Sequence, residues 1–180
     1  MTLSLSLFET TLGWCGLIGS QDRIVGCLLP EASPALVRAR LLRSRPEARD
    51  APPTPGLQRA ITRVRGLIDG ANDDLLDLDL DMSSVSDFER RVYALAREIR
   101  PGQTSTYGDI ARALGDLNES RAVGVALGRN PFAPIVPCHR VVAAGQKLGG
   151  FSATGGRALK LRMLANESRW AADDLFGRAN

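Results

Sequence analysis

The sequence predicts an α/β N-terminal domain followed by a mostly α-helical C-terminal domain that carries a winged-helix-like helix-turn-helix. Three observations lead to this fold class. Residues 3–29 alternate between apolar and polar positions and contain short polar turns, which is typical of strands. Residues 34–68 contain two apolar stripes at helical spacing. Residues 106–129 contain two short helical patterns on either side of a glycine turn, which indicates a helix-turn-helix.

The composition indicates a small intracellular protein. The chain has 180 residues, enough for one domain or two small ones. It contains neither a stretch long enough for a membrane span nor the pattern of a signal peptide, so we expect a soluble, cytoplasmic protein that does not bind membranes. The three cysteines, Cys15, Cys27 and Cys138, lack CxxC spacing, which argues against a disulfide framework and a zinc finger.

The charge is distributed unevenly along the chain. Residues 1–82 carry nine arginines against eleven acidic residues, a net charge of −2, whereas residues 83–168 carry twelve basic against seven acidic residues, a net charge of +5. Residues 169–180 are neutral. An acidic half joined to a basic half suggests that the second half faces a polyanion, although ordinary surface charge would give the same numbers.

The N-terminal elements follow in order. Leucine and serine alternate over residues 3–7, and apolar runs at 13–18 and 23–29 flank a polar turn at 20–22, which predicts three strands. A helix over residues 34–45, a proline-rich loop over 45–55 and a second helix are expected next. The predicted apolar faces are Leu36, Ala39 and Leu42 in the first helix and Leu57, Ile61, Val64 and Ile68 in the second.

A domain boundary is predicted near residues 82–85, which divides the chain into domains at 1–82 and 83–168 and a tail at 169–180. Before the boundary, aspartate and leucine alternate strictly over residues 77–81, which predicts a strand with one acidic, wet face that points away from any bound polyanion. In the tail, the large apolar residues expected to pack are Trp170, Leu175 and Phe176.

After the boundary, Ser86 and Glu89 form a capping-box pattern at the start of a helix. Pro101-Gly102 is expected to stop that helix. Its apolar residues at helical spacing are Phe88, Val92, Leu95, Ala96 and Ile99.

The helix-turn-helix pattern begins where Thr106 can cap a helix over residues 107–114. A turn at 115–118 leads to a second helix at 120–129, on which arginines lie beside glycines, so that the backbone can approach a ligand closely. The core face of this helix is Val123, Ala126 and Leu127, and the opposite face is Arg121, Gly124, Val125, Gly128 and Arg129. DNA binding and a pair of packed surface helices without nucleic acid both fit this pattern.

A thiol and an imidazole are adjacent near the end of the chain. His139 is the only histidine, and it directly follows Cys138 after the apolar, strand-like stretch 130–136. Any mechanism that needs an imidazole near neutral pH must therefore use His139. A free thiol has a pKa of about 8.5, so a nearby base acting through a bridging water or a turn would raise the thiolate fraction.

Glu167 is the candidate to orient this histidine, because it continues the apolar stripe of a helix predicted at 156–167. The alternatives are that Glu167 lies past the helix end in water and that Cys138 is an inert core residue. An inert core position is the interpretation given to Cys15 and Cys27.

Between residues 86 and 167 the chain carries an ordered series of short motifs. They are Arg100-Pro101-Gly102, Thr106-Tyr107-Gly108, Arg121-Ala122-Val123-Gly124, Asn130-Pro131, Pro137-Cys138-His139-Arg140-Val141-Val142, Gly149-Gly150-Phe151-Ser152, Lys160 and Glu167. This series resembles the O6-alkylguanine-DNA alkyltransferases, the suicide DNA-repair methyltransferases, and it is highly specific. Residues 1–80 resemble the variable N-terminal domain of that family only weakly, through Phe8, Thr11 and Gly13.

The resemblance implies a methylated-DNA–protein-cysteine methyltransferase that acts once per molecule. It would transfer an alkyl group from O6 of guanine, and from O4 of thymine, to Cys138 after the nucleotide flips out of the duplex. His139 would take the thiol proton through water, and Glu167 would orient His139. Tyr107 would help to protonate N3 of the leaving guanine, and Asn130 would hold the turn before the active-site strand.

The resemblance also implies contacts with double-stranded DNA. Arg121 would fill the stack where the flipped nucleotide was, and Tyr107, Gly124 and Arg129 would be further DNA contacts. The base pocket would be formed by Val141, Phe151 and Ser152. No cofactor and no metal are implied, the protein would act as a monomer, and in a bacterium it would be associated with the nucleoid.

Phe151 departs from the family pattern, because a tyrosine is common at that position, and the loop from Ser152 to Lys160 is slightly longer than in some members. The zinc site of some relatives is not expected, since His139 is the only histidine. Three alternatives remain. A non-catalytic lesion-binding relative would lack the acceptor cysteine, a helix-turn-helix regulator would leave the Cys-His-Glu set unexplained, and a cysteine hydrolase would turn over repeatedly.

Overall fold

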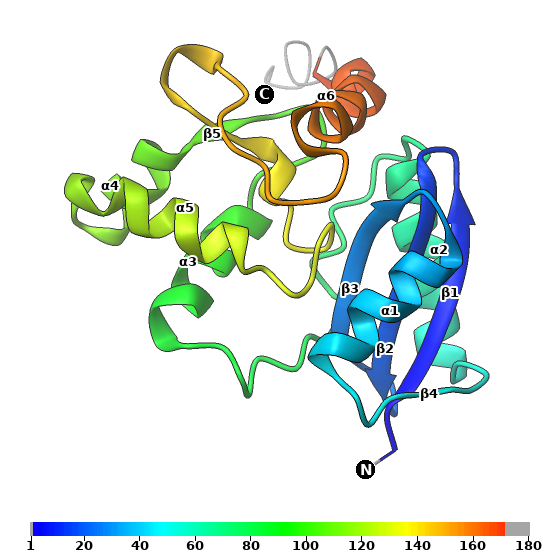
Figure 1. Ribbon diagram of the computed structural model, residues 1–180. Coiled ribbons are helices and arrows are strands. Elements are labelled where there is room, and N and C mark those ends of the chain that lie inside the picture. The colour runs from blue at the N-terminus through cyan, green and yellow to red at the C-terminus, as the bar shows by residue number, and fades with distance from the viewer. Residues whose placement is uncertain (1, 172–180) are drawn as a thin grey trace, which may run out of the picture.

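The first three strands of the chain form most of a mixed sheet in the computed structural model, which describes residues 2–171 (Figure 1). The strands of this sheet are β1 (Ser4–Thr10), β2 (Gly13–Ser20), β3 (Arg23–Glu31) and β4 (Arg49–Asp50). Their order is β3-β2-β1-β4, with β1, β2 and β3 antiparallel and β4 parallel to β1. The three strands expected within residues 3–29 are confirmed, whereas β4 lies inside the segment predicted as a loop.

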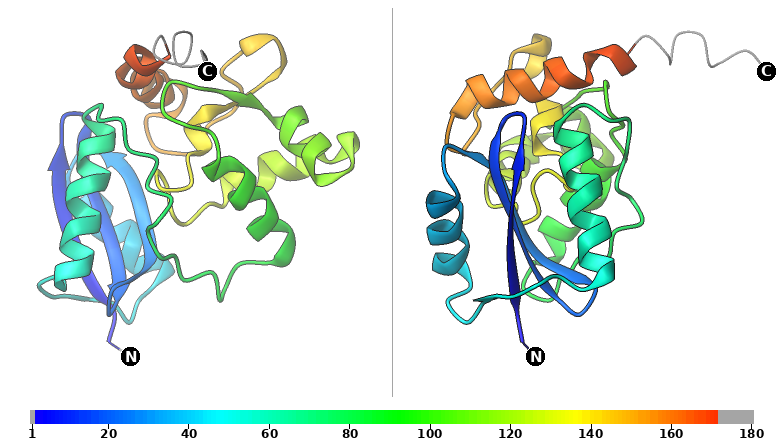
Figure 2. Two further views of the ribbon diagram at one scale, coloured as in Figure 1. Left: turned by 180° about the vertical axis from the view of Figure 1, so that it is seen from behind. Right: turned by 90° about the vertical axis from the view of Figure 1, so that its right-hand side faces the viewer.

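Helices α1 (Pro34–Ser44) and α2 (Pro55–Ile68) cover opposite faces of the sheet (Figure 2). Each begins with a proline after a hydroxyl cap, in which Ser33 or Thr54 accepts a hydrogen bond from a backbone N–H of the first turn. The predicted stripe of α2 is confirmed, because Leu57, Ile61, Val64 and Ile68 are all buried.

The predicted face of α1 is wrong. Val37 and Leu41 are buried against the sheet, whereas Leu36 is 48% exposed, Ala39 is exposed and Leu42 is half-buried. The reason lies in β2, where Gly16 leaves room for the helix. A Cβ atom at Gly16 would lie 2.6 Å from side-chain carbons of both Val37 and Leu41. These two side chains, four residues apart, therefore fill that space.

The C-terminal part is mostly helical (Figure 1), with the bounds α3 (Asp87–Arg97), α4 (Tyr107–Leu114), α5 (Ser120–Gly128) and α6 (Gly156–Glu167). Complete capping boxes start two of them, Ser86 with Glu89 at α3 and Thr106 with Asp109 at α4. α4 ends at Gly115, whose φ of 105° lies in the left-handed region. A 3-10 turn (Leu117–Glu119) then leads into α5, whose buried residues are Val123, Ala126 and Leu127, as expected.

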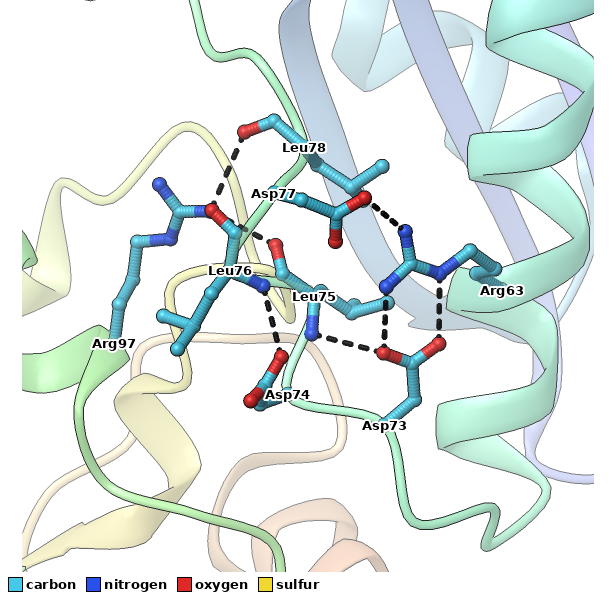
Figure 3. A network of polar contacts seen from close by, with 8 residues as sticks. All are labelled: Arg63, Asp73, Asp74, Leu75, Leu76, Asp77, Leu78 and Arg97. Carbon is cyan, nitrogen blue, oxygen red and sulfur yellow. Dashed lines mark hydrogen bonds and ion pairs between the residues drawn. The ribbon is translucent and has the colours of Figure 1, made fainter.

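The strand predicted at 77–81 is not formed, and Leu80 makes one isolated bridge to Ile24. Two arginines hold this segment instead (Figure 3). Arg63 of α2 binds the carboxylates of Asp73 and Asp77, and Arg97 of α3 donates to the carbonyl oxygens of three nearby residues. Those three acceptors are Leu75, Leu76 and Leu78. The arginine contacts therefore replace the ladder that the alternation predicted.

The strand-like stretch 130–136 is also not a strand. It is a series of turns in which Phe132 forms one isolated bridge with Cys27 of β3. Cys138 lies in the following 3-10 helix (Cys138–Arg140), and β6 (Val141–Val142) comes next. β6 pairs in parallel with β5 (Ser105–Thr106), which places the start of α4 beside the thiol segment.

One core joins the two parts of the chain. A single cluster of buried apolar side chains includes residues of β1–β3, α2, α3, α5 and α6. The outer edge of β3 is covered by the C-terminal part, since Cys27 N donates to Pro131 O at 2.8 Å. The predicted domain boundary at 82/83 stays a prediction.

The end of the described chain packs on the N-terminal part. Asn166 donates to Ile68 O, and Trp170 Nε1 donates to Gly70 O at 3.0 Å, so the expected packing of Trp170 is confirmed. Leu175 and Phe176 lie outside the described residues. Within residues 2–171, no helix is long and apolar enough to cross a membrane.

We predict that Arg97→Met lowers the free energy of unfolding by about 1–3 kcal/mol, because partly buried carbonyls lose their donor while the apolar stem remains. Arg23→Met is the matched control. It removes a pair with Asp79 of the same segment, but the two side chains are 56% and 60% exposed, so the expected loss is below about 1 kcal/mol. Urea denaturation measures both, and equal losses would contradict the structural role of Arg97.

Candidate active site

A cavity of about 960 Å³ lies between β3, α1 and the C-terminal helices, and the Cys138 side chain lies in its wall. Most of the predicted site residues line this cavity, namely Tyr107, Arg121, Gly124, Asn130, Cys138, Phe151 and Ser152. Arg129 lines a second hollow of about 550 Å³, which shares Arg121 with the first. Val141 is buried and its carbonyl oxygen is bound by Lys160, so its backbone oxygen is occupied within the protein.

Asn130 fixes the turn that leads to the thiol. Its Nδ2 donates to Val136 O at 2.8 Å, and its Oδ1 accepts from Phe132 N at 2.9 Å. Burial raises the pKa of the Cys138 thiol, and a hydrogen bond with Asn130 and the charge of Lys160 offset part of this rise. At neutral pH the resting cysteine is therefore the thiol, and its reaction requires a base.

His139 lies behind the thiol segment, fully buried, with Nε2 2.9 Å from Glu167 Oε1. Glu167 is the last residue of α6 and is 2% exposed, so it continues the buried stripe and does not lie in water. Because a carboxylate accepts hydrogen bonds, Nε2 carries the proton and Nδ1 has the free lone pair. Nδ1 is one of two buried side-chain nitrogens without a hydrogen-bond partner in the described part of the chain.

The burial of His139 favours its neutral form, against the charge of Glu167. Burial lowers the pKa of His139, and Glu167 opposes this effect only in part. Burial alone would raise the pKa of Glu167, but hydrogen bonds from His139 and Arg140 outweigh it and hold this pKa at about 2. A carboxylate beside a neutral imidazole is the arrangement of a base with its orienting partner.

Arg140 was missed by the reasoning from sequence. It is 1% exposed and grips the carboxylate of Glu167 with Nε and Nη2, both at 2.9 Å, while Nη1 donates to Ile99 O at 2.7 Å. A bidentate pair of this kind neutralises the buried charge of Glu167. The signal that could have found it is an arginine that directly follows the histidine and precedes the apolar pair Val141-Val142.

Lys160 was also left without a role. It is fully buried on α6, donates from Nζ to Val141 O at 2.5 Å, and lies 5.5 Å and 5.9 Å from the ring centres of Phe151 and Tyr107. Burial lowers its pKa to about 8. Its position on the same face as Leu159 and Met163 was a readable signal, since a lysine on an apolar face needs a partner.

The remaining wall belongs to the helix-turn-helix. Tyr107 begins α4, and its hydroxyl donates to Gly150 O at 3.3 Å. A Cβ atom at Gly124 would lie 3.8 Å from the Tyr107 ring, so α5 packs beside that ring. Ser152 donates to Gly128 O at 3.1 Å, which joins the loop before α6 to the end of α5. Arg121 is exposed at the mouth of the cavity.

Together these residues can perform nucleophilic displacement. A cavity large enough for a nucleobase has a thiol in its wall, a neutral imidazole behind it, and a cationic lysine nearby. Within residues 2–171, no group of three or more His, Cys, Asp or Glu side chains is arranged to hold a metal ion.

Comparison with known proteins gives three kinds of match. Residues 87–169 match the family model described as 6-O-methylguanine DNA methyltransferase, DNA binding domain. The methylated-DNA–protein-cysteine methyltransferase of Mycolicibacterium paratuberculosis is 45% identical over 93 residues, 52% of this chain and 54% of that protein. The alignments thus span a little over half the length of the first curated relatives.

Solved structures match over nearly the whole chain. The crystal structure of Mycobacterium tuberculosis OGT in complex with DNA superposes with a TM-score of 0.73 at 30% identity, covering 96% of this chain and 97% of that one. The O6-methylguanine-DNA methyltransferase from the hyperthermophilic archaeon Pyrococcus kodakaraensis strain KOD1 has a TM-score of 0.71 at 30% identity, covering 92% and 99%. The expected α/β N-terminal part and helical C-terminal part are therefore confirmed.

The lowered pKa of Glu167 predicts a pH dependence of stability. A carboxyl with a folded pKa of about 2 and an ordinary value of 4.5 stabilises the fold above pH 4.5, and this stabilisation is lost as the pH falls through 2. The gap in free energy of unfolding between wild type and Glu167→Gln should narrow by about 3 kcal/mol from pH 6 to pH 2, at 1.36 kcal/mol per pKa unit. Urea denaturation at each pH measures this gap, and a constant gap would contradict the assignment.

Proposed function

Because the chain belongs to the 6-O-methylguanine DNA methyltransferase family, we propose that it repairs DNA by moving an alkyl group from O6 of guanine to Cys138. The observation that carries this proposal is the Cys138 thiol in the wall of a base-sized cavity, backed by the buried pair of His139 and Glu167. The same chemistry would act on O4 of thymine.

The proposed reaction is a direct displacement. The thiol proton passes through a water molecule to Nδ1 of His139, while Glu167 holds Nε2–H and stabilises the imidazolium that forms. The sulfur then forms a bond to the alkyl carbon as the bond from that carbon to O6 breaks. The electron pair returns to the guanine, and Tyr107 supplies the proton to N3. The resulting thioether has no hydrolytic exit, so each molecule acts once.

DNA is the proposed partner, bound as a duplex through the helix-turn-helix of α4 and α5. The M. tuberculosis relative has been crystallised in complex with DNA. In this chain Arg121 and Gly124 lie on the face of α5 that lines the cavity, and the exposed Arg129 directly follows that helix. The alkyl group lies inside the duplex, so the nucleotide must be flipped into the cavity at a cost of a few kcal/mol. Arg121 would fill the stack behind it.

The finer parts of the proposal rest on the same residues. Phe151, Ser152 and the backbone near Val141 would form the base pocket, with Asn130 holding the turn. The small β5–β6 pair beside α4 and α5 supports the winged-helix-like description of the DNA-binding part. The protein would act as a monomer in the cytoplasm, associated with the nucleoid in a bacterium, without metal or cofactor.

The proposal predicts stoichiometric labelling. Incubation with a duplex that contains O6-methylguanine should add the mass of one methyl group per molecule, on the peptide that contains Cys138, because the thioether cannot be hydrolysed. Intact-mass and peptide mass spectrometry measure this. Cys138→Ser should gain no mass and still bind the duplex. Label on Cys15 or Cys27, or repair beyond one equivalent, would overturn the proposal.

The role of Arg121 predicts a difference between substrates. Since flipping costs a few kcal/mol, Arg121→Ala should slow repair of duplex DNA by roughly 10- to 100-fold and slow reaction with free O6-benzylguanine by less than about twofold. Arg59→Ala, an exposed arginine of α2, is the matched control and should change neither rate. Equal losses on both substrates would remove the proposed role.

A further inference from the structure

An arginine of the N-terminal part reaches the loop that precedes α6. Nη1 of Arg40, on α1, donates both to Oε1 of Glu31 at the end of β3 and to Oγ1 of Thr154. Arg40 and Glu31 also line the cavity that contains Cys138. We propose that Arg40 is a positioning residue that latches the loop 151–156 to the N-terminal sheet and thereby sets the width of the base pocket.

Glu31 anchors this latch. Its side chain is only 4% exposed, and its backbone is held opposite Trp14 in the β2–β3 ladder. A buried carboxylate needs a charged partner, and Arg40, with a side chain 36% exposed, is that partner. The ion pair with Glu31 therefore holds the guanidinium of Arg40 beside the sheet, in a position from which it also donates to Thr154.

The loop needs such an anchor. Gly155 and Gly156, which follow Thr154, have φ values of 87° and 49°, in the left-handed region that glycine adopts without steric cost, and ordering glycine costs more conformational entropy than ordering other residues. The loop is also held at its start by the bond from Ser152 to Gly128 O of α5 and by Lys160 beside the Phe151 ring. Phe151 and Ser152 line the cavity, so a shift of Thr154 moves the wall that would contact the base.

The latch acts on binding and not on the displacement step. His139 and Glu167 lie behind the thiol and bond to each other, and Glu167 also bonds to Arg140, whereas Arg40 bonds to Glu31 and Thr154. Loss of the latch should therefore weaken capture of the base and leave the limiting rate of alkyl transfer unchanged. This inference rests on the proposed function, since the ligand of the cavity is taken to be an alkylated guanine.

The test compares Arg40→Ala, Thr154→Val and the double variant with Arg38→Ala as control. Arg38 lies on the same helix and pairs with Asp50 at the surface. The half-saturating concentration of free O6-benzylguanine should rise by about 2- to 10-fold in each single variant, as expected for the loss of one hydrogen bond. The limiting rate should stay within about twofold. The double variant should lose no more than Arg40→Ala alone, because Arg40→Ala already removes the contact with Thr154.

Hydrogen exchange of the amides in residues 150–156 is the second readout, and it requires no alkyl transfer. Exchange there should accelerate in Arg40→Ala and Thr154→Val and stay at the wild-type rate in Arg38→Ala. If the wild-type protein transfers no alkyl group but the loop amides still exchange faster in the two variants, the proposed function is contradicted and the role of Arg40 in holding the loop is supported.

Two results would overturn the latch. One is an amide hydrogen-exchange rate in residues 150–156 that stays at the wild-type value in both Arg40→Ala and Thr154→Val. The other is evidence that Arg40 contacts a DNA phosphate. In that case the plot of the logarithm of the DNA-binding constant against the logarithm of the salt concentration would have a slope smaller by about one in Arg40→Ala, and hydrogen exchange in the loop would be unchanged.

Discussion

Burial of the Glu167 carboxylate is the constraint on which the site depends. A charge removed from water is costly unless donors surround it, and here Nε2 of His139 and two nitrogens of Arg140 meet the two oxygens at 2.9 Å. Arg140 continues to Ile99 O beyond the end of α3. The end of α6, the 3-10 helix that carries Cys138, and the segment after α3 are thereby held together by one carboxylate.

That cluster also sets the protonation states. Burial keeps the imidazole beside this carboxylate neutral, with a smaller contribution from the charge of Arg140, and burial also keeps the thiol protonated. The resting pair is thus uncharged, which suits a buried nucleophile that must not react before its substrate arrives. Lys160 adds a cation beside the cavity whose attraction would grow as the sulfur becomes anionic.

Short sequence patterns correctly predicted the features of the fold that depend on interactions between residues close in sequence. The capping boxes at Ser86 and Thr106, the strands of residues 3–29 and the buried face of α5 depend on neighbours in sequence, and each is present. The strand predicted at 77–81 is absent because Asp77 is bound by Arg63 and the carbonyls of Leu75, Leu76 and Leu78 by Arg97, and these arginines come from helices before and after the segment. The predicted apolar face of α1 is wrong because Gly16, which lies on strand β2, determines which side chains of the helix fit against the sheet.

The same distinction applies to the candidate site. Cys138 and His139 could be read from a short motif, and Glu167 from a helical stripe, but the partners Arg140, Lys160 and Arg40 act through contacts made by distant elements. The cavity itself has walls from β3 and α1 as well as from the helices, and β3 is bonded along its edge to residues 131 and 79–81. Since one continuous core joins β3 to the C-terminal helices, a change in the N-terminal sheet alters the shape that the thiol faces. Under the proposed function, the part of the chain with the weakest family resemblance would therefore influence which base and which alkyl group the cavity can hold.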